Sequence, residues 1–166
     1  MSYAFRPVGA GDLPLLNAWV ARPHVACWWG EGETFDAEYL ADPQAALWIV
    51  ALDGRDFAFA QDYAVHGFGP HHFDYLPAGA RGIDQFIGEA DLINRGHGGA
   101  LVRRQLDRLF AGGAPVVGAD PHPDNPRAIA AYRKAGFRDT GVVRATPWGR
   151  SLLMECWRVD RAEPST

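Results

Sequence analysis

The sequence predicts a mixed α/β domain built around a single β-sheet. Short apolar runs of strand character recur along the chain, amphipathic stretches long enough for helices stand between them, and turn signals separate the two. The 166 residues suffice for one domain with a sizeable core and are too few for two ordinary ones. We therefore expect a single domain over residues 1–161 and a frayed tail at 162–166.

The N-terminal half should contain a strand, two helices and a hairpin. A strand over 3–8 precedes a helix that Asp12 can cap, with an apolar face formed by Leu13, Leu15, Leu16 and Trp19. Residues 24–33 are rich in turn formers, and 34–40 could form a second short helix. Strands over 47–52 and 57–65 flank Asp53-Gly54, a strong hairpin signal. The loop over 66–81 that follows is long, and loops of this length are usually functional or disordered.

The C-terminal half alternates strands and helices. A strand over 82–92 leads to a glycine cluster and a helix that runs to about residue 110. A strand over 116–120 precedes a helix over 126–135, which Asn125 or a neighbour starts and Gly136 closes in the left-handed conformation. Two last strands, 137–145 and 152–159, flank a turn at 147–149. The predicted order is β-α-α-β-β-β-α-β-α-β-β.

Composition argues against several classes of protein. A net charge of −4 disfavours nucleic acid as the main partner, since phosphate binding needs a basic face. The longest apolar run, 45–52, is too short to span a membrane, and the N-terminus lacks a secretory signal. Cys27 and Cys156 have no metal-ligand spacing, so we expect reduced cysteines in the cytoplasm. The loop histidines 66, 71 and 72 with Asp74 also lack such spacing, and we expect no metal.

The central feature is a glycine turn, Gly96-His97-Gly98-Gly99, between a predicted strand and a predicted helix. Glycines let the backbone approach a ligand closely, and the first N–H groups of a helix are unpaired. Such a site suits an anion, and a pyrophosphate fits it well; a plain turn is the alternative. The Rossmann glycine pattern and the Walker lysine are absent, which disfavours dinucleotides and nucleoside triphosphates. We expect the His97 side chain to face solvent or phosphate.

A longer pattern carries a family resemblance. The strand, the G-x-G-G turn that opens a helix, the next strand and then N-x-x-A-x-x-x-Y-x-K-x-G-F over 125–137 together resemble the coenzyme A half of the GNAT superfamily of N-acetyltransferases. The segments Arg81-Gly-Ile-Asp84-Gln, Trp28-Trp29-Gly30 and Asp120-Pro-x-Pro-x-Asn resemble aminoglycoside 6′-N-acetyltransferases. The resemblance covers nearly the whole chain and is looser over 70–80 and after residue 139. Ile93 stands where the GNAT signature usually has Gln or Arg.

This resemblance implies a GNAT fold, a single mixed, mostly antiparallel sheet flanked by helices, with a splayed pair of parallel strands that holds acetyl-CoA. It implies acetyl-CoA-dependent transfer to a primary amine of a small cationic acceptor, foremost the 6′-amine of an aminoglycoside, as in antibiotic resistance. Contacts with the cofactor are expected from Leu92, Ile93, Arg95, Gly96, His97, Gly98, Gly99, Ala100, Asn125, Ala128, Tyr132 and Lys134. From the pattern alone, Asn125 could equally be a helix cap and Lys134 a solvated lysine.

Acetyl transfer to an amine needs a base and an acid. An alkylammonium has a pKa of about 10.4, so at neutral pH it must lose a proton before it attacks. Asp84 stands inside a predicted strand, where an acidic side chain is unfavourable unless something compensates. It is therefore our first candidate for the base, directly or through a water, with a solvated edge residue as the alternative. The resemblance makes Tyr132 the proton donor to the leaving thiolate, although its pattern alone also fits a core tyrosine.

A cationic acceptor calls for carboxylates and a surface on which it can stack. Trp28 and Trp29 can supply stacking or cation–π surface, and because neighbours on a regular element face opposite ways, one can lie in the core. The candidate carboxylates for this acceptor site are Asp74, Asp84, Asp120 and also Asp62.

Other functions stay open at this point. They are acetylation of a hydroxylated amine in siderophore biosynthesis, acetylation of a protein N-terminus, and a coenzyme A-binding sensor without catalysis. The presence of both Asp84 and Tyr132 argues against the sensor, because a pure binding module needs neither. We expect a small-molecule amine substrate, no nucleic acid or membrane partner, and a monomer or homodimer.

Overall fold

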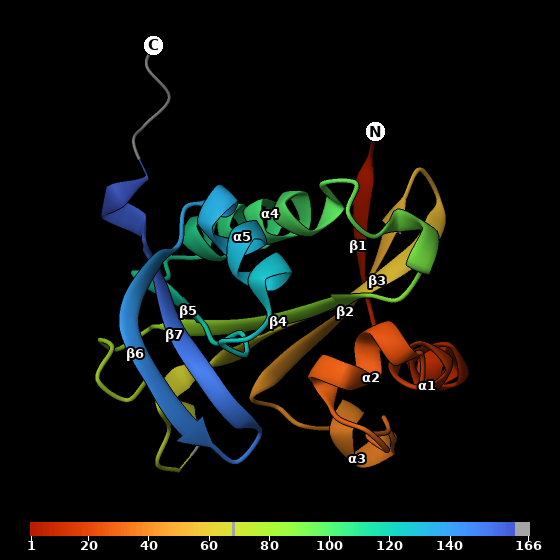
Figure 1. Cartoon of the computed structure of the whole chain (residues 1–166), viewed down its shortest axis with the longest axis horizontal. Coiled ribbons are helices and arrows are strands. Elements are labelled where there is room, and N and C mark those ends of the chain that lie inside the picture. The colour runs from red at the N-terminus through yellow and green to blue at the C-terminus, as the bar shows by residue number, and fades with distance from the viewer. Residues whose placement is uncertain (68, 162–166) are drawn as a thin grey trace. The chain divides into compact units, whose positions relative to one another are not determined.

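The computed structural model describes residues 1–67 and 69–161 and contains a mixed seven-stranded sheet in the order β1-β2-β3-β4-β5-β7-β6 (Figure 1). Residue contacts divide the chain into two compact units. Unit 1 comprises residues 1–62 and 84–98, and unit 2 comprises residues 63–83 and 99–166, so β3 and β4 contribute to both. The tail predicted at 162–166 lies outside the described residues, and the single domain stays a prediction. In the described part of the chain, no helix is long and apolar enough to cross a membrane.

The elements of the N-terminal half follow the predicted order except for one additional helix, α2. They are β1 (Tyr3–Pro7), α1 (Leu13–Val20), α2 (Pro23–Trp29), α3 (Ala37–Leu40), β2 (Ala45–Leu52), β3 (Arg55–Ala64) and β4 (Arg81–Ile87). β1 pairs with β2 in antiparallel register from Tyr3↔Leu52 to Pro7↔Trp48. The predicted hairpin turn between β2 and β3 is confirmed, since Asp53 and Gly54 have φ angles of 49° and 87°.

Three local predictions in unit 1 are wrong. The turn-rich stretch 24–33 is largely the helix α2, which Pro23 opens at a position that tolerates proline and Gly30 ends. Asp12 stands at the N-cap position of α1, but the predicted capping hydrogen bond is not formed, because its carboxylate accepts from the Gly9 N–H at 2.8 Å and pairs with Arg6. The strand predicted to reach residue 92 ends at Ile87, and a 3-10 turn over 90–92 follows.

The core of unit 1 forms where α1 and α2 pack on the strands. Leu16, Trp19 and Val20 of α1 and Val25 of α2 are buried against side chains of β2, β3 and β4, namely Leu47, Ile49, Phe59 and Phe86. Burial of each large apolar side chain contributes roughly 1.5–3 kcal/mol. Gly88 is required beside this core, because a Cβ there would lie 2.3 Å from the Trp19 ring.

Unit 2 contains most of the C-terminal elements, α4 (His97–Ala111), β5 (Val116–Ala119), α5 (Pro126–Ala135), β6 (Arg138–Thr146) and β7 (Gly149–Trp157). β5 is parallel to β4, with Arg81↔Val117 and Gly82↔Gly118 in register, and antiparallel to β7. β6 and β7 form the last hairpin, closed at Thr146↔Gly149. The predicted parallel pair within a mostly antiparallel sheet is therefore β4 and β5.

One face of β5 and β7 carries the core of unit 2. Val117 and Ala119 alternate with residues of the other face and are buried with side chains of β7, α4 and α5, namely Met154, Cys156, Val102, Leu106, Leu109, Ile129 and Tyr132. On the opposite face the Phe73 ring occupies the space where a Cβ of Gly118 would lie, at 2.8 Å. This contact anchors the long loop between β3 and β4 to the sheet.

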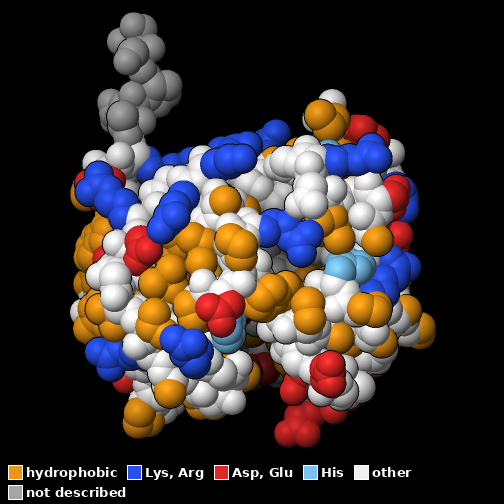
Figure 2. Space-filling model, in the orientation of Figure 1, with side chains coloured by type: hydrophobic (Ala, Val, Ile, Leu, Met, Phe, Trp, Pro, Cys, Tyr) orange, Lys and Arg blue, Asp and Glu red, His pale blue; other side chains and the backbone are white. Residues whose placement is uncertain are grey.

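The outer hairpin leaves an apolar surface exposed. β6 is the last strand in the sheet order, and most of its residues are exposed. Figure 2 shows hydrophobic side chains gathered over β6, at the left of the view. Val142, Val143 and the hairpin residue Trp148 are exposed by 41%, 43% and 75%.

Candidate active site

Gly96 of the glycine turn directly precedes α4, and His97, Gly98 and Gly99 form the start of that helix. Asn94 and Gly96 have φ angles of 61° and 86°, in the left-handed region that favours glycine and asparagine. A methyl group on Gly96 would meet no atom of the described residues within 4 Å, so glycine is needed there for its backbone angle. The first turn of α4 contains no acidic residue, and nothing in its sequence opposes an anion at the helix N-terminus. Binding of a cofactor pyrophosphate at this turn stays a prediction.

His97, at the first position of α4, is buried, and the prediction that its side chain faces solvent or phosphate is wrong. Its Nδ1 lies 2.7 Å from the hydroxyl oxygen of Tyr3, and its ring packs edge-on against Phe57 at 5.6 Å between centroids. Gln85 of β4 donates from Nε2 to the carbonyl of Gly98 at 3.1 Å. Side chains of β1, β3 and β4 thus hold the turn, and His97 has only its backbone to offer a ligand.

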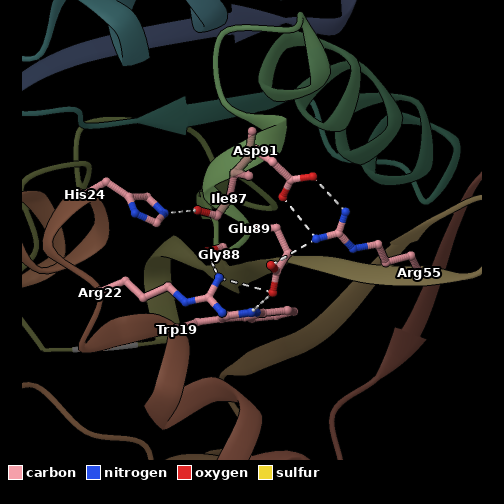
Figure 3. Close-up of polar contacts among 8 residues, drawn as sticks. All are labelled: Trp19, Arg22, His24, Arg55, Ile87, Gly88, Glu89 and Asp91. Atoms are coloured by element: carbon pink, nitrogen blue, oxygen red, sulfur yellow. Dashed lines mark hydrogen bonds and ion pairs between the residues drawn. The ribbon is translucent and has the colours of Figure 1, made fainter.

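The segment between β4 and the glycine turn is held by a cluster of charges around Glu89, which no sequence pattern had indicated. Its carboxylate accepts a hydrogen bond from Trp19 Nε1 at 2.8 Å and forms ion pairs with Arg22 and Arg55, each at 3.1 Å (Figure 3). Arg55 also pairs with Asp91 at 2.8 Å. The hydrogen bond from Trp19, and then those from Arg22, lower the pKa of Glu89, so it stays ionised.

Two side chains of the α2 region satisfy backbone carbonyls where β4 ends. Arg22 donates to the carbonyl of Gly88 at 2.6 Å, and His24 Nε2 lies 3.0 Å from the carbonyl of Ile87 (Figure 3). The N–H groups of Gly88 and Glu89 both donate to the carbonyl of Phe57 of β3, at 2.8 and 3.2 Å. Because two N–H groups share one carbonyl, the regular hydrogen-bond pattern between β3 and β4 ends here, and β4 stops before residue 92.

Asp84 is half-buried in β4, an interior strand, so the alternative of a solvated edge residue is wrong. Its Oδ2 accepts a hydrogen bond from Gln61 Nε2 at 2.8 Å, and Gln61 Oε1 accepts one from the Tyr39 hydroxyl at 2.7 Å. Burial, and then the charge of Asp84, raise the pKa of Tyr39. Sequence reasoning missed both partners, because neither Gln61 nor Tyr39 carries a recognisable motif.

The two adjacent tryptophans of α2 differ in burial. Trp29 is partly buried and packs against the core of unit 1, with edge-on contacts to Phe86 and Phe59 at 5.0 and 5.7 Å. Trp28 is 42% exposed. Trp28 is therefore the more accessible of the two rings, and its contact with an acceptor stays a prediction.

In unit 2, Tyr132 lies in the core with 7% of its surface exposed and packs against Phe137 at 5.2 Å between ring centroids. Asn125 is the N-cap of α5, with its Oδ1 accepting from the Ala128 N–H at 3.1 Å. Lys134 is exposed in the last turn of the helix. The remaining predicted cofactor contacts range from buried to exposed: Leu92 is buried, Ile93, Ala100 and Ala128 are half-buried, and Arg95 is exposed.

The carboxylates of unit 2 have histidine neighbours that the sequence did not reveal. Asp120 follows β5, and its Oδ2 lies 2.8 Å from His72 Nε2. The His72 ring stacks on His71 at 4.0 Å, and the exposed Asp74 accepts from the His71 backbone N–H at 2.7 Å. Burial, and then the charge of His72, lower the pKa of His71. In the described residues, no group of three or more histidine, cysteine or acidic residues could hold a metal ion.

Asp62 of unit 1 is not an acceptor carboxylate. It is only 1% exposed, and its Oδ2 accepts from Trp48 Nε1 at 3.0 Å. Its carboxylate is therefore closed off from solvent and from a ligand that arrives through solvent.

Comparison with known proteins assigns the family. The model of the acetyltransferase (GNAT) domain matches residues 9–145. The aminoglycoside N(6′)-acetyltransferase type 1 of Klebsiella pneumoniae is 33% identical over 165 residues, which cover 92% of this chain and 82% of that protein. The structure of AAC(6′)-Ib with paromomycin and acetyl-CoA has a TM-score of 0.89 at 30% identity and covers both chains completely. The complex of AAC(6′)-Ib with coenzyme A and kanamycin has a TM-score of 0.85 at 31% identity, covering 95% of this chain and 96% of that one. This chain belongs to the acetyltransferase (GNAT) family.

Proposed function

We propose that this protein transfers the acetyl group of acetyl-CoA to the 6′-amine of an aminoglycoside, as the names of its relatives describe for them. The observation that carries the proposal is Asp84, a hydrogen-bonded carboxylate on the strand that leads into the glycine turn. The carboxylate of Asp84 can bind a small cationic acceptor, and the glycine turn can bind the cofactor that carries the thioester. We further propose that it works in the cytoplasm, as a monomer or homodimer.

The backbone of the glycine turn is our candidate for binding the pyrophosphate. The N–H groups at the start of α4 supply donors and the positive end of the helix dipole. Arg95 in unit 1 and Lys134 in unit 2 are exposed cations and stay separate candidates for cofactor contacts. When bound, acetyl-CoA supplies the acetyl group as a thioester.

Asp84 and Tyr132 divide the proton transfers. Asp84 takes one proton from the ammonium group, so that the neutral nitrogen can add to the thioester carbonyl. A C–N bond forms and the C–S bond breaks, and Tyr132 donates its hydroxyl proton to the departing thiolate. The nitrogen loses a second proton, which restores Tyr132, and the net reaction releases one proton. The buried, core-packed ring of Tyr132 supports this role because its position is fixed.

Carboxylates and one aromatic ring would recognise the acceptor. Asp84, Asp120 and Asp74 are negatively charged groups that can bind ammonium groups, and Trp28 offers an exposed ring surface. Aminoglycosides carry several ammonium groups, which are the groups that carboxylates bind.

The decisive experiment measures release of the coenzyme A thiol with purified protein, acetyl-CoA and kanamycin. The expected product is monoacetylated, and mass spectrometry with NMR should locate the acetyl group on the 6′-nitrogen. An aminoglycoside that carries a hydroxyl at position 6′ serves as the matched control and should not turn over. Preference for a hydroxylated amine or a peptide N-terminus, or equal turnover of the control, would overturn the proposal.

A further inference from the structure

We propose that Tyr39 and Gln61 are positioning residues that orient the carboxylate of Asp84 for the acceptor amine. This inference rests on the proposed function, because it assumes that Asp84 meets the amine. We call Tyr39, Gln61 and Asp84 the hydrogen-bonded triad. All three side chains belong to unit 1 and are half-buried.

The direction of the hydrogen bonds is set at Asp84, because an ionised carboxylate can only accept. The hydroxyl donates to Gln61 Oε1 at 2.7 Å, which turns the amide nitrogen toward Asp84, and Nε2 donates to Oδ2 at 2.8 Å. An amide offers donors only on its nitrogen and acceptors only on its oxygen. A reversed Gln61 would bring its carbonyl oxygen against a carboxylate, so Asp84 fixes the direction, and the hydroxyl of Tyr39 holds the amide in that orientation by donating to its oxygen.

Tyr39 keeps its proton under all ordinary conditions. Its pKa is raised by burial and by the charge of Asp84, with smaller contributions from Glu33 and Asp42, whereas the hydrogen bond to Gln61 lowers it in part. Because the hydroxyl stays protonated at neutral and mildly alkaline pH, the triad is a fixed support for the carboxylate.

The scaffold holds each member of the triad. Asp84 and Gln61 stand on β4 and β3, which are neighbours in the sheet. Tyr39 lies on α3, where its backbone N–H donates to Asp36 at 2.8 Å and its ring packs against Phe35 at 4.8 Å. Gln61 is a neutral donor, so it orients the carboxylate and leaves its charge in place; a lysine at this position would neutralise the charge that attracts the acceptor.

The test uses steady-state kinetics of the full chain with kanamycin and acetyl-CoA. Tyr39→Phe removes only the hydroxyl and should lower kcat/KM for kanamycin by about 3- to 10-fold, the effect of one neutral hydrogen bond. Gln61→Met removes the donor to Asp84 and should lower it by about 10-fold or more. The KM for acetyl-CoA should stay within about 2-fold, a split that general loosening of the fold would not produce.

A double-mutant cycle tests whether the residues act in series. Tyr39→Phe should add nothing to Gln61→Met, and Gln61→Met should add nothing to Asp84→Asn. Tyr75→Phe and Gln44→Met are matched controls for the same chemical changes, and both should leave kinetics unchanged. The Tyr75 hydroxyl donates to Glu155 at 2.5 Å in unit 2, and Gln44 precedes β2.

The outcomes separate this inference from the proposed function. If Asp84→Asn is impaired while Tyr39→Phe and Gln61→Met match the wild type, the triad has only a structural role. This inference would then be wrong, and the proposed function would stand. Additive effects, or an equal rise in the KM for acetyl-CoA, would also overturn it. A folded wild-type protein that acetylates no amine would overturn the proposed function and this inference with it. Melting temperatures show which variants fold, and Tyr39→Phe retains the ring that packs on Phe35.

Discussion

Replacement of Asp84 by asparagine separates the charge of this side chain from its shape. Gln61 Nε2 donates to Oδ2 of Asp84 at 2.8 Å, and the amide oxygen of an asparagine can accept the same hydrogen bond. We therefore expect little change in melting temperature. A hydrogen bond between the acceptor ammonium and the charged carboxylate is worth about 1.5–3 kcal/mol, which corresponds to a rise in KM of about 10- to 150-fold. Loss of the base should lower kcat by a further factor of about 10²–10⁴.

Initial rates with kanamycin across pH distinguish the two roles of Asp84. In the wild type, kcat/KM should fall at low pH as the base becomes protonated, and the variant should lose this limb of the profile. A rise in KM with kcat and the limb unchanged would make Asp84 an anchor only. The matched control is Asp107→Asn, which removes an exposed ion pair with Arg161 and should be kinetically silent. Unchanged kcat, KM and pH profile in Asp84→Asn would refute the assignment, and Asp120 would be tested next.

Acetyl-CoA at 100 times its Kd should stabilise the protein by about 2.7 kcal/mol, seen as a higher melting temperature, and absence of binding in calorimetry at millimolar cofactor would contradict the cofactor site. Tyr132→Phe should retain the core packing and lower kcat by about 10²–10⁴-fold; near-normal turnover would return Tyr132 to a purely structural role. In the folded protein the pKa of Glu89 is lowered, mainly by the hydrogen bond from Trp19. The ionised Glu89 therefore stabilises the fold above pH 4.5, its usual pKa, and this stabilisation is lost as the pH falls below that value. Glu89→Gln should therefore flatten the fall in melting temperature at acid pH, and an unchanged acid limb would show that other groups cause that fall.

Much of the fold is predictable because its signals are local. Asp53-Gly54 adopts the backbone angles of a tight hairpin turn, Asn125 caps α5, and Gly136 closes it with a φ of 110°. Each depends on a residue's own conformational preference or on a neighbour three or four positions away. The errors arise where distant residues decide. His97 is buried by Tyr3 and Phe57, and no property of the glycine turn itself indicates those contacts.

In the candidate site, too, local motifs are predictable and contacts between distant residues are not. Asp84 and Tyr132 stand in recognisable motifs, whereas the donor to Asp84 comes from Gln61, 23 positions earlier, and its own partner Tyr39 lies another 22 positions before that. A glutamine in a strand and a tyrosine in a short helix carry no signal of this role. Gln61 meets Asp84 because β3 pairs with β4, and this pairing is seen only in the folded sheet.

The placement of Asp84 and the glycine turn along one continuous segment has a mechanistic consequence. Binding an anion to backbone N–H groups costs less free energy when those groups are already held in place. Here Glu89 and its ion-pair partners Arg22 and Arg55, the Glu89 cluster, hold the segment after β4. Gln85 donates to the carbonyl of Gly98, and His97 is hydrogen-bonded to Tyr3. The same strand carries Asp84 only one residue before Gln85, so the contacts that preorganise the cofactor turn also fix the backbone of the proposed base. Variants that loosen the Glu89 cluster should therefore affect the KM for acetyl-CoA and for the amine together, unlike variants of the hydrogen-bonded triad, which act on the amine alone.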